Sequence, residues 1–284
     1  MIDETVAEIE EMQTHSSSVV AVKAAEALRD LLDREYPTVE EYVRDLERNS
    51  RALKRANPSH ASLHTTQNEI VTTVDEADVT DVAEAKQLTD ATIDAVVETV
   101  EHGKKRAAEN AAEILTDGTT LLTHDYSTTL LEAIELAARD GAHLDVYVTE
   151  ARPRYLGRKA VRTLAGIDRV DPTLVVDAAA AHVLDDCDLV ALGMTCIVED
   201  VYYNRIGTFP IAATANELAV PVHVVGSSSK VIEHGGFKFE NEFRTTTEVM
   251  REPADGFDIV NPAYDATPLH LVDSLVTDEG REKQ

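Results

Sequence analysis

The sequence predicts an α/β protein: an N-terminal helical domain over residues 1–115, then a Rossmann-like domain with a mostly parallel sheet over residues 116–284. Before the Asp117-Gly118 turn, apolar residues recur at helical spacing. Beyond that turn, short apolar runs alternate with helical segments. This alternation is typical of βαβ units, whose strands form a parallel sheet.

Successive helices are predicted in the N-terminal domain. The apolar residues of VVAVKAAEALRDLLDREY, which begins at Val19, recur at helical spacing. Pro37 ends this helix, and Thr38 with Glu41 has the pattern of a capping box for the next one. A long helical stretch then covers about residues 79–115.

Five short apolar strands are predicted in the C-terminal domain. They are found in LTHDYS from Leu122, VYVTEARP from Val146, VVDAAAA from Val175, LVALGMTCI from Leu189 and VPVHVVGSSSK from Val220. Helices are expected to begin near Thr128, Pro153, Asp177 and Gly207. In an open parallel sheet the ligand crevice lies beyond the carboxyl ends of the strands. Polar residues gather at those ends, which predicts a small-molecule pocket.

The charge balance disfavours two classes of partner. The 284 residues include 53 acidic and 26 basic side chains, for a net charge of −27. Binding to nucleic acid or to an anionic membrane requires clustered Lys and Arg. Because the acidity is spread along the whole chain, it favours a protein adapted to high salt. A basic partner surface is the alternative.

Other sequence features predict a soluble, cytoplasmic protein without a cofactor or a metal. The two cysteines, Cys187 and Cys196, are too few for a disulfide framework. The N-terminus has no apolar signal core, and no window approaches the length of a membrane span. Neither a dinucleotide-binding glycine loop, a Walker loop nor an HExxH site occurs.

Asp125 is the first candidate site residue. It lies between the predicted strand Thr119–Thr123 and the helix from Thr128, with Tyr126 beside it. Its carboxylate could bind a hydroxyl group, act as a base or cap the helix. The position at a strand end favours the pocket. Asp177 holds a similar position after a later strand. It could either cap a helix or reach the pocket, and the sequence leaves both roles open.

Two predicted helix starts could bind anions. Glu150, Arg152 and Arg158 surround the start expected at Pro153, within a basic run that is unusual in so acidic a chain. Backbone amides at a helix start and nearby guanidinium groups together favour phosphate. Ordinary charge balance on a helix surface is the alternative.

The second start follows Asn204, Arg205 and Gly207, and it could bind an anion in the same way. Cys196 is a candidate nucleophile by position alone. A thiolate needs a basic or helix-terminal environment, which the sequence does not fix. A buried, unreactive thiol is therefore favoured.

The C-terminal domain resembles a known family. The segments LTHDYSTTLLEAIELAARDGAHLDVYVTEARPRYLGRKAVRTL, VVDAAAAHVLDDCDLVALGM, NRIGTFPIAATANELAVPVHVVGSSSKV and NPAYDATP are similar to the alpha subunit of translation initiation factor 2B. The resemblance covers about Thr119–Thr277. Its superfamily includes ribose 1,5-bisphosphate isomerase and methylthioribose 1-phosphate isomerase. The resemblance implies a helical domain, then a Rossmann-like domain through which two copies form a homodimer.

The resemblance also implies that the usual catalytic pair is replaced. The isomerases carry a Cys after a Thr-His pair and an Asp in a GADRI-like motif. The matching positions here hold Asp125 and Thr195, and both are expected to contact the ligand. The anion-binding pattern is kept, with Arg205 where the family usually has Lys.

These features favour a regulatory protein that binds a sugar phosphate or a nucleotide monophosphate without isomerase chemistry. Initiation factor 2 is a partner implied by the resemblance alone. The alternative is an aldose–ketose isomerase of the ribose 1,5-bisphosphate type, which would work through Asp125 and Cys196. A third hypothesis, a purely structural assembly subunit, predicts that no ligand stabilises the protein.

Overall fold

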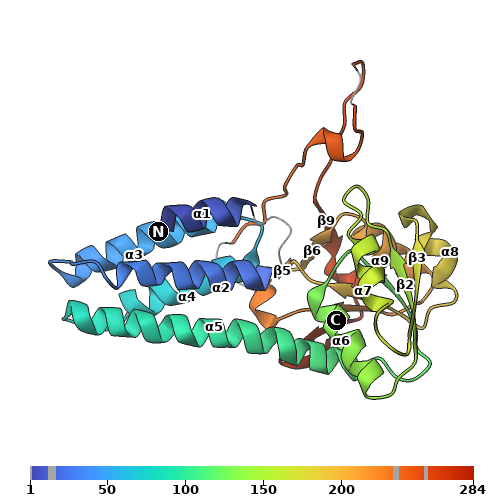
Figure 1. The fold of residues 1–284 in the computed structure, drawn as a ribbon, viewed down its shortest axis with the longest axis horizontal. Helices are drawn as coiled ribbons and strands as arrows, with labels where there is room; N and C mark the ends of the chain where they lie inside the picture. The colour runs from blue at the N-terminus through green and yellow to red at the C-terminus, as the bar shows by residue number, and fades with distance from the viewer. Residues whose placement is uncertain (1, 12–16, 233–236, 253–254) are drawn as a thin grey trace. The chain divides into compact units, whose positions relative to one another are not determined.

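The computed structural model describes residues 2–11, 17–232, 237–252 and 255–284 (Figure 1). The chain forms two compact units, Met1–His102 and Gly103–Gln284. Their boundary falls inside one continuous helix, whereas the sequence pattern indicated a boundary at 115–116. A helix that continues through a boundary gives the sequence no turn signal there. The helical N-terminal region and the mostly parallel sheet confirm the predicted fold class.

The first unit is helical. Its elements are α1 (Ile2–Glu11), α2 (Ser17–Ala27), the 3₁₀ turn η1 (Leu28–Leu31), α3 (Val39–Ala56), α4 (Ala61–Asp75) and the first part of α5 (Val82–Ala112). The Thr38 side chain accepts a hydrogen bond from the Glu41 amide, as the capping pattern predicts. Leu46, Leu63 and Ile70 belong to its buried core.

The second unit contains a seven-stranded sheet in the order β11-β10-β7-β4-β1-β2-β3. The strands are β1 (Thr120–His124), β2 (Leu144–Thr149), β3 (Val170–Val175), β4 (Leu189–Gly193), β7 (Val222–Val225), β10 (Ser274–Thr277) and β11 (Gly280–Lys283). Only β11 pairs in the antiparallel direction. The chain runs outward from β1 through β2 to β3 and then returns to the other side of β1 as β4. This reversal places the ligand crevice of such sheets between β1 and β4.

Two helical layers cover the sheet. The helices are α6 (Thr128–Arg139), α7 (Gly157–Leu164), α8 (Ala180–Leu184) and α9 (Thr208–Glu217). Leu121 belongs to the core formed with α6 and α7, and Leu122 to the core formed with α8 and α9. Successive side chains of a strand point to opposite faces, so adjacent leucines supply both cores.

A smaller sheet was not predicted from the sequence. Its order is β8-β5-β6-β9, with β5 (Cys196–Val198), β6 (Val201–Arg205), β8 (Val231–Ile232) and β9 (Tyr264–Pro268). The remaining 3₁₀ turns are η2 (Asp177–Ala179), η3 (Ser228–Lys230), η4 (Thr246–Glu248) and η5 (Leu269–Leu271). Strands of two to five residues carry too little periodicity to be recognised alone.

Helix α7 begins later than predicted. It starts at Gly157 rather than Pro153, and the residues between form a turn. A Cβ added to Gly157 would lie 1.8 Å from the Thr149 carbonyl oxygen. Only glycine allows the start of this helix to approach β2 so closely.

Gly157→Ala should therefore destabilise the protein by roughly 3 kcal/mol, because the new methyl group must displace backbone. Gly166→Ala is the matched control, since its nearest atom would be 3.5 Å away. It should change stability by less than about 0.5 kcal/mol. Urea unfolding of both variants measures the difference, and equal stability would contradict the close approach.

Candidate functional site

Asp125 lies at the carboxyl end of β1, at the reversal of the sheet. Its side chain is largely buried, and its φ of 64° is left-handed. A non-glycine residue with this φ is uncommon and is found often at functional sites. Its Oδ2 lies 3.3 Å from Nε of Arg205, at the end of β6. The pair joins the large sheet to the small one.

His124 fixes both partners of this ion pair. Its Nδ1 lies 2.6 Å from the Thr149 hydroxyl, and its Nε2 lies 2.7 Å from the carbonyl oxygen of Ile206. The carbonyl can only accept, so Nε2 donates this hydrogen bond. Gly207, with a φ of 106°, lies over the ring, and a Cβ there would come within 2.7 Å of it. The glycine lets the loop close onto the histidine.

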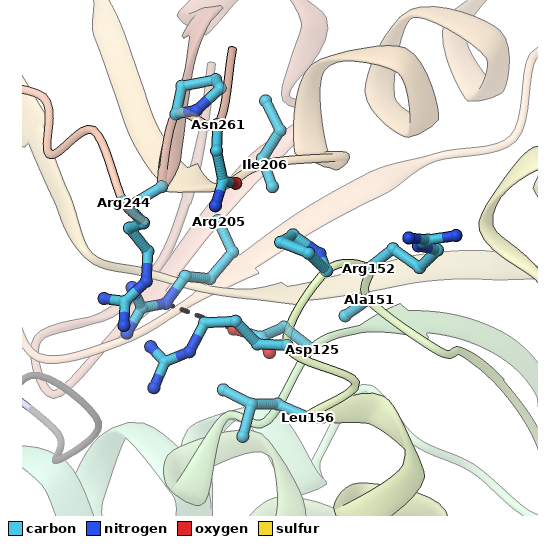
Figure 2. A pocket seen from close by; sticks show the side chains of 12 residues that line it. Asp125, Ala151, Arg152, Leu156, Arg205, Ile206, Arg244 and Asn261 are labelled. Atoms are coloured by element: carbon cyan, nitrogen blue, oxygen red, sulfur yellow. Dashed lines mark ion pairs between the residues drawn. The ribbon is translucent and has the colours of Figure 1, made fainter. Parts of the chain in front are cut away.

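Asp125 and Arg205 line an open pocket. Figure 2 shows the guanidinium groups of Arg205 and Arg244 on the same side of the pocket as Asp125. The other lining residues are Ala151, Arg152, Pro153, Arg154, Leu156, Ile206, Asn261, Pro262 and Ala263. The pocket lining therefore combines one aspartate with four arginines.

Two of the guanidinium groups have unused donors. Nη1 of Arg154 and Nη1 of Arg205 are buried and have no hydrogen-bond partner within the described residues. Burial, and then repulsion from Arg244 and Arg205, lowers the pKa of Arg154. Buried donors normally find a partner, and arginine forks suit phosphate and carboxylate oxygens. The pocket therefore has the chemistry of an anion site.

Asp177 fixes the loop that carries Arg154. Its carboxylate accepts hydrogen bonds from the amides of Ala151, at 2.8 Å, and Arg152, at 2.7 Å. Asp177 thus holds the loop that lines the pocket, which is neither of the two roles considered for it.

Several predicted ligands are engaged elsewhere. Arg158 forms an ion pair of 2.6 Å with Glu150, and its guanidinium lies 3.8 Å from the Tyr155 ring centre. The Arg152 side chain points away from Asp125 in Figure 2, and its Nη2 donates to the Val249 carbonyl oxygen at 3.1 Å. Charge balance accounts for Arg158, whereas Arg152 still lines the pocket.

Three of the other predicted ligands form hydrogen bonds within the protein. The Thr195 hydroxyl donates to Asn204 at 3.3 Å, and the Asn204 amide donates to Thr208 at 3.1 Å. The Gly207 amide donates to Asp265 at 2.8 Å. Tyr126 is half-buried, and its ring contacts the Lys159 ammonium group at 4.2 Å instead.

Cys196 is fully buried at the start of β5. Burial raises the pKa of its thiol to about 12, although nearby Lys230 opposes the shift. The thiol is therefore protonated near neutral pH and cannot act as a base there. This leaves Asp125 as the remaining member of the pair considered for isomerase chemistry.

Sequence reasoning missed four residues near this end of the sheet. Arg154 was part of the basic run but not of the predicted ligand set, and Arg244 and Asn261 are far away in the chain. Lys230 is almost completely buried, and its Nζ donates to the Met194 carbonyl oxygen at 2.9 Å. No local pattern distinguishes these side chains from surface charges. In the described part of the chain, no cluster of His, Cys, Asp and Glu could hold a metal ion.

Comparison with known proteins establishes the family. The model of the Initiation factor 2 subunit family matches residues 13–283, and the chain belongs to that family. The ribose 1,5-bisphosphate isomerase of Haloterrigena turkmenica is 32% identical over 98% of this chain and 88% of its own. The enzyme of that name from Haloferax volcanii is 30% identical over 98% of this chain and 87% of its own.

A solved structure shows the same fold. The translation initiation factor eIF-2B of Pyrococcus horikoshii has a TM-score of 0.81 and 22% identity, over 99% of this chain and 96% of its own. Within the described residues, no helix combines the length and the apolar character needed to cross a bilayer.

The comparisons correct the function predicted first. Six curated relatives, at 28–32% identity, are named ribose 1,5-bisphosphate isomerase. They favour the isomerase alternative over a regulatory protein without catalysis. The earlier prediction was wrong because it equated replacement of two residues with loss of the reaction. A carboxylate, like a thiolate, can act as a general base.

Lys230→Met should change how stability depends on pH. Burial lowers the pKa of Lys230 from the ordinary 10.5 to about 8. Between these values the unfolded chain binds the proton and the folded protein does not. The contribution of Lys230 to stability therefore rises with pH in this window, by roughly 2 kcal/mol between pH 8 and pH 10. Urea unfolding in molar potassium chloride should show the wild type gaining this much stability relative to the variant, because the raised pKa of Cys196 affects both proteins alike. Parallel curves would contradict the assignment.

Proposed function

We propose that the protein is an aldose–ketose isomerase of a phosphorylated pentose, with ribose 1,5-bisphosphate as the expected substrate. The observation that carries the proposal is the largely buried Asp125 carboxylate, beside Arg205 in a pocket with unused guanidinium donors. It combines a proton acceptor with anion recognition. The names of the curated relatives support the substrate class.

The reaction needs a base close to C2 of the sugar. The conversion opens the ring by breaking the bond between C1 and the ring oxygen, moves one hydrogen from C2 to C1, and makes C2 a carbonyl carbon. One proton leaves as that carbonyl forms, and one is taken up by the ring oxygen. Asp125 would accept the first proton. No electron acceptor is required, because oxidation at C2 balances reduction at C1.

The arginines would supply binding and charge stabilisation. Arg205 next to Asp125 can hold a substrate oxygen while keeping the carboxylate in place. A fork of guanidinium donors recognises phosphate oxygens with defined geometry. A partly buried site strengthens these contacts because water competes with them less.

Asp125→Asn should lower turnover of ribose 1,5-bisphosphate by roughly 100-fold or more, because an amide cannot accept the proton. Cys196→Ser is the control, and it should keep turnover within about threefold since the protonated thiol has no part in the reaction. Phosphorus NMR in molar potassium chloride follows conversion to the ketose.

Absence of conversion by folded wild-type protein would refute the isomerase. If conversion occurs and Asp125→Asn retains it, the reaction stands but the base lies elsewhere.

A further inference from the structure

A second group of charges lies in the same pocket, and Figure 2 shows the Arg244 guanidinium next to that of Arg205. Arg244, from the segment that precedes η4, has its Nη1 2.7 Å from Oε1 of Glu242 and its Nη2 3.0 Å from Oε1 of Glu248. Although burial opposes the shift, these carboxylates raise the pKa of Arg244. Its guanidinium is therefore held in one position, with only 11% of the side chain exposed.

Arg154 differs from Arg244 in having no such compensation. Its Nη1 is buried without a partner in the described residues, although it lies in the electrostatic field of two other arginines. Asp125 and Glu248 act on it only through space. A partly buried cation among like charges lowers the stability of a protein unless an anion joins it. Asp177 holds the loop that carries Arg154 through the amides of Ala151 and Arg152.

We infer that Arg154, together with Arg244, forms a separate phosphate subsite that makes the enzyme selective for bisphosphates. This inference rests on the proposed function, because it assigns the subsite to the phosphate remote from the reacting carbons. In ribose 1,5-bisphosphate that group is the 5-phosphate. Asp125 and Arg205 would then act at C1 and C2, while Arg154 and Arg244 would bind the phosphate at the other end of the sugar.

The subsite explains the geometry of the pocket lining. A phosphate has three terminal oxygens, and it can accept from two guanidinium groups at once. Arg244 is already oriented by its carboxylates, and Asn261 is held close by, donating to the Thr245 carbonyl oxygen at 3.0 Å. Arg154 supplies the free donor. Such preorganisation lowers the entropy that binding must overcome.

Equilibrium binding of two ketose phosphates tests the subsite. Ribulose 1,5-bisphosphate carries the 5-phosphate, and ribulose 1-phosphate lacks only that group. Calorimetric titration should show that Arg154→Gln weakens binding of the bisphosphate roughly 10- to 100-fold, the loss expected for a charge-assisted arginine–phosphate contact. Binding of ribulose 1-phosphate should change less than about twofold, since it makes no such contact.

Arg162→Gln is the matched control. Arg162 is exposed on α7, and its Nη1 donates to the Arg158 carbonyl oxygen. The Arg162→Gln substitution removes the same charge from the same unit and leaves the pocket residues unchanged. Both ligands should bind this variant as they bind the wild type. Arg154 is the better target than Arg244, because removal of Arg244 would also leave Glu242 and Glu248 without their partner.

Thermal unfolding without ligand gives an independent readout. Arg154→Gln should keep or raise the unfolding midpoint, because it removes a repelled cation; a residue that serves only the fold would lower it. A lower midpoint, equal weakening of both ligands, or unchanged bisphosphate binding would each overturn the inference. Failure of turnover alone would refute the isomerase but leave this binding test intact.

Discussion

The two hydrogen bonds of the buried His124 ring hold the site together. One joins the ends of β1 and β2 through Thr149, and the other fastens the loop after β6 through the carbonyl oxygen of Ile206. Each is worth about 1 kcal/mol net, but an orphaned buried partner would cost more. Because Asp125 follows the histidine and Arg205 precedes Ile206 in the chain, the ring sets the distance between them. The pocket depends on that distance.

Charge is distributed unevenly in this molecule. A chain with a net charge of −27 nonetheless gathers four arginines around one pocket. Local carboxylates fix Arg205 and Arg244 in position, whereas Arg154 stays uncompensated by hydrogen bonds. At molar salt the Debye length is about 3 Å, so the acidic surface would repel an anionic substrate little. Contacts inside a partly buried pocket are screened much less.

The structure around the two replaced catalytic positions changes how their replacement is interpreted. The thiol expected after the Thr-His pair is absent, but the carboxylate of Asp125 occupies that strand end in a constrained left-handed conformation. The neighbouring Cys196, which the sequence offered as a substitute, is directed into the core. Residue type at two positions therefore does not decide whether the reaction is retained. The proposed isomerase depends instead on the chemical groups that the fold brings together in the pocket.

Local patterns in the sequence were enough to predict the α/β fold, the parallel strands and the position of Asp125 at the end of a strand. The apolar periods and the polar residues at strand ends can be recognised from residues that are close together in the sequence. Tertiary structure decides whether Arg158 faces a ligand or Glu150, and whether Cys196 is buried. It also places Arg154 and Arg244 in the same pocket. These contacts join segments far apart in the chain, through β-pairing and loop closure. Their energies depend on burial and on neighbours that no local window contains.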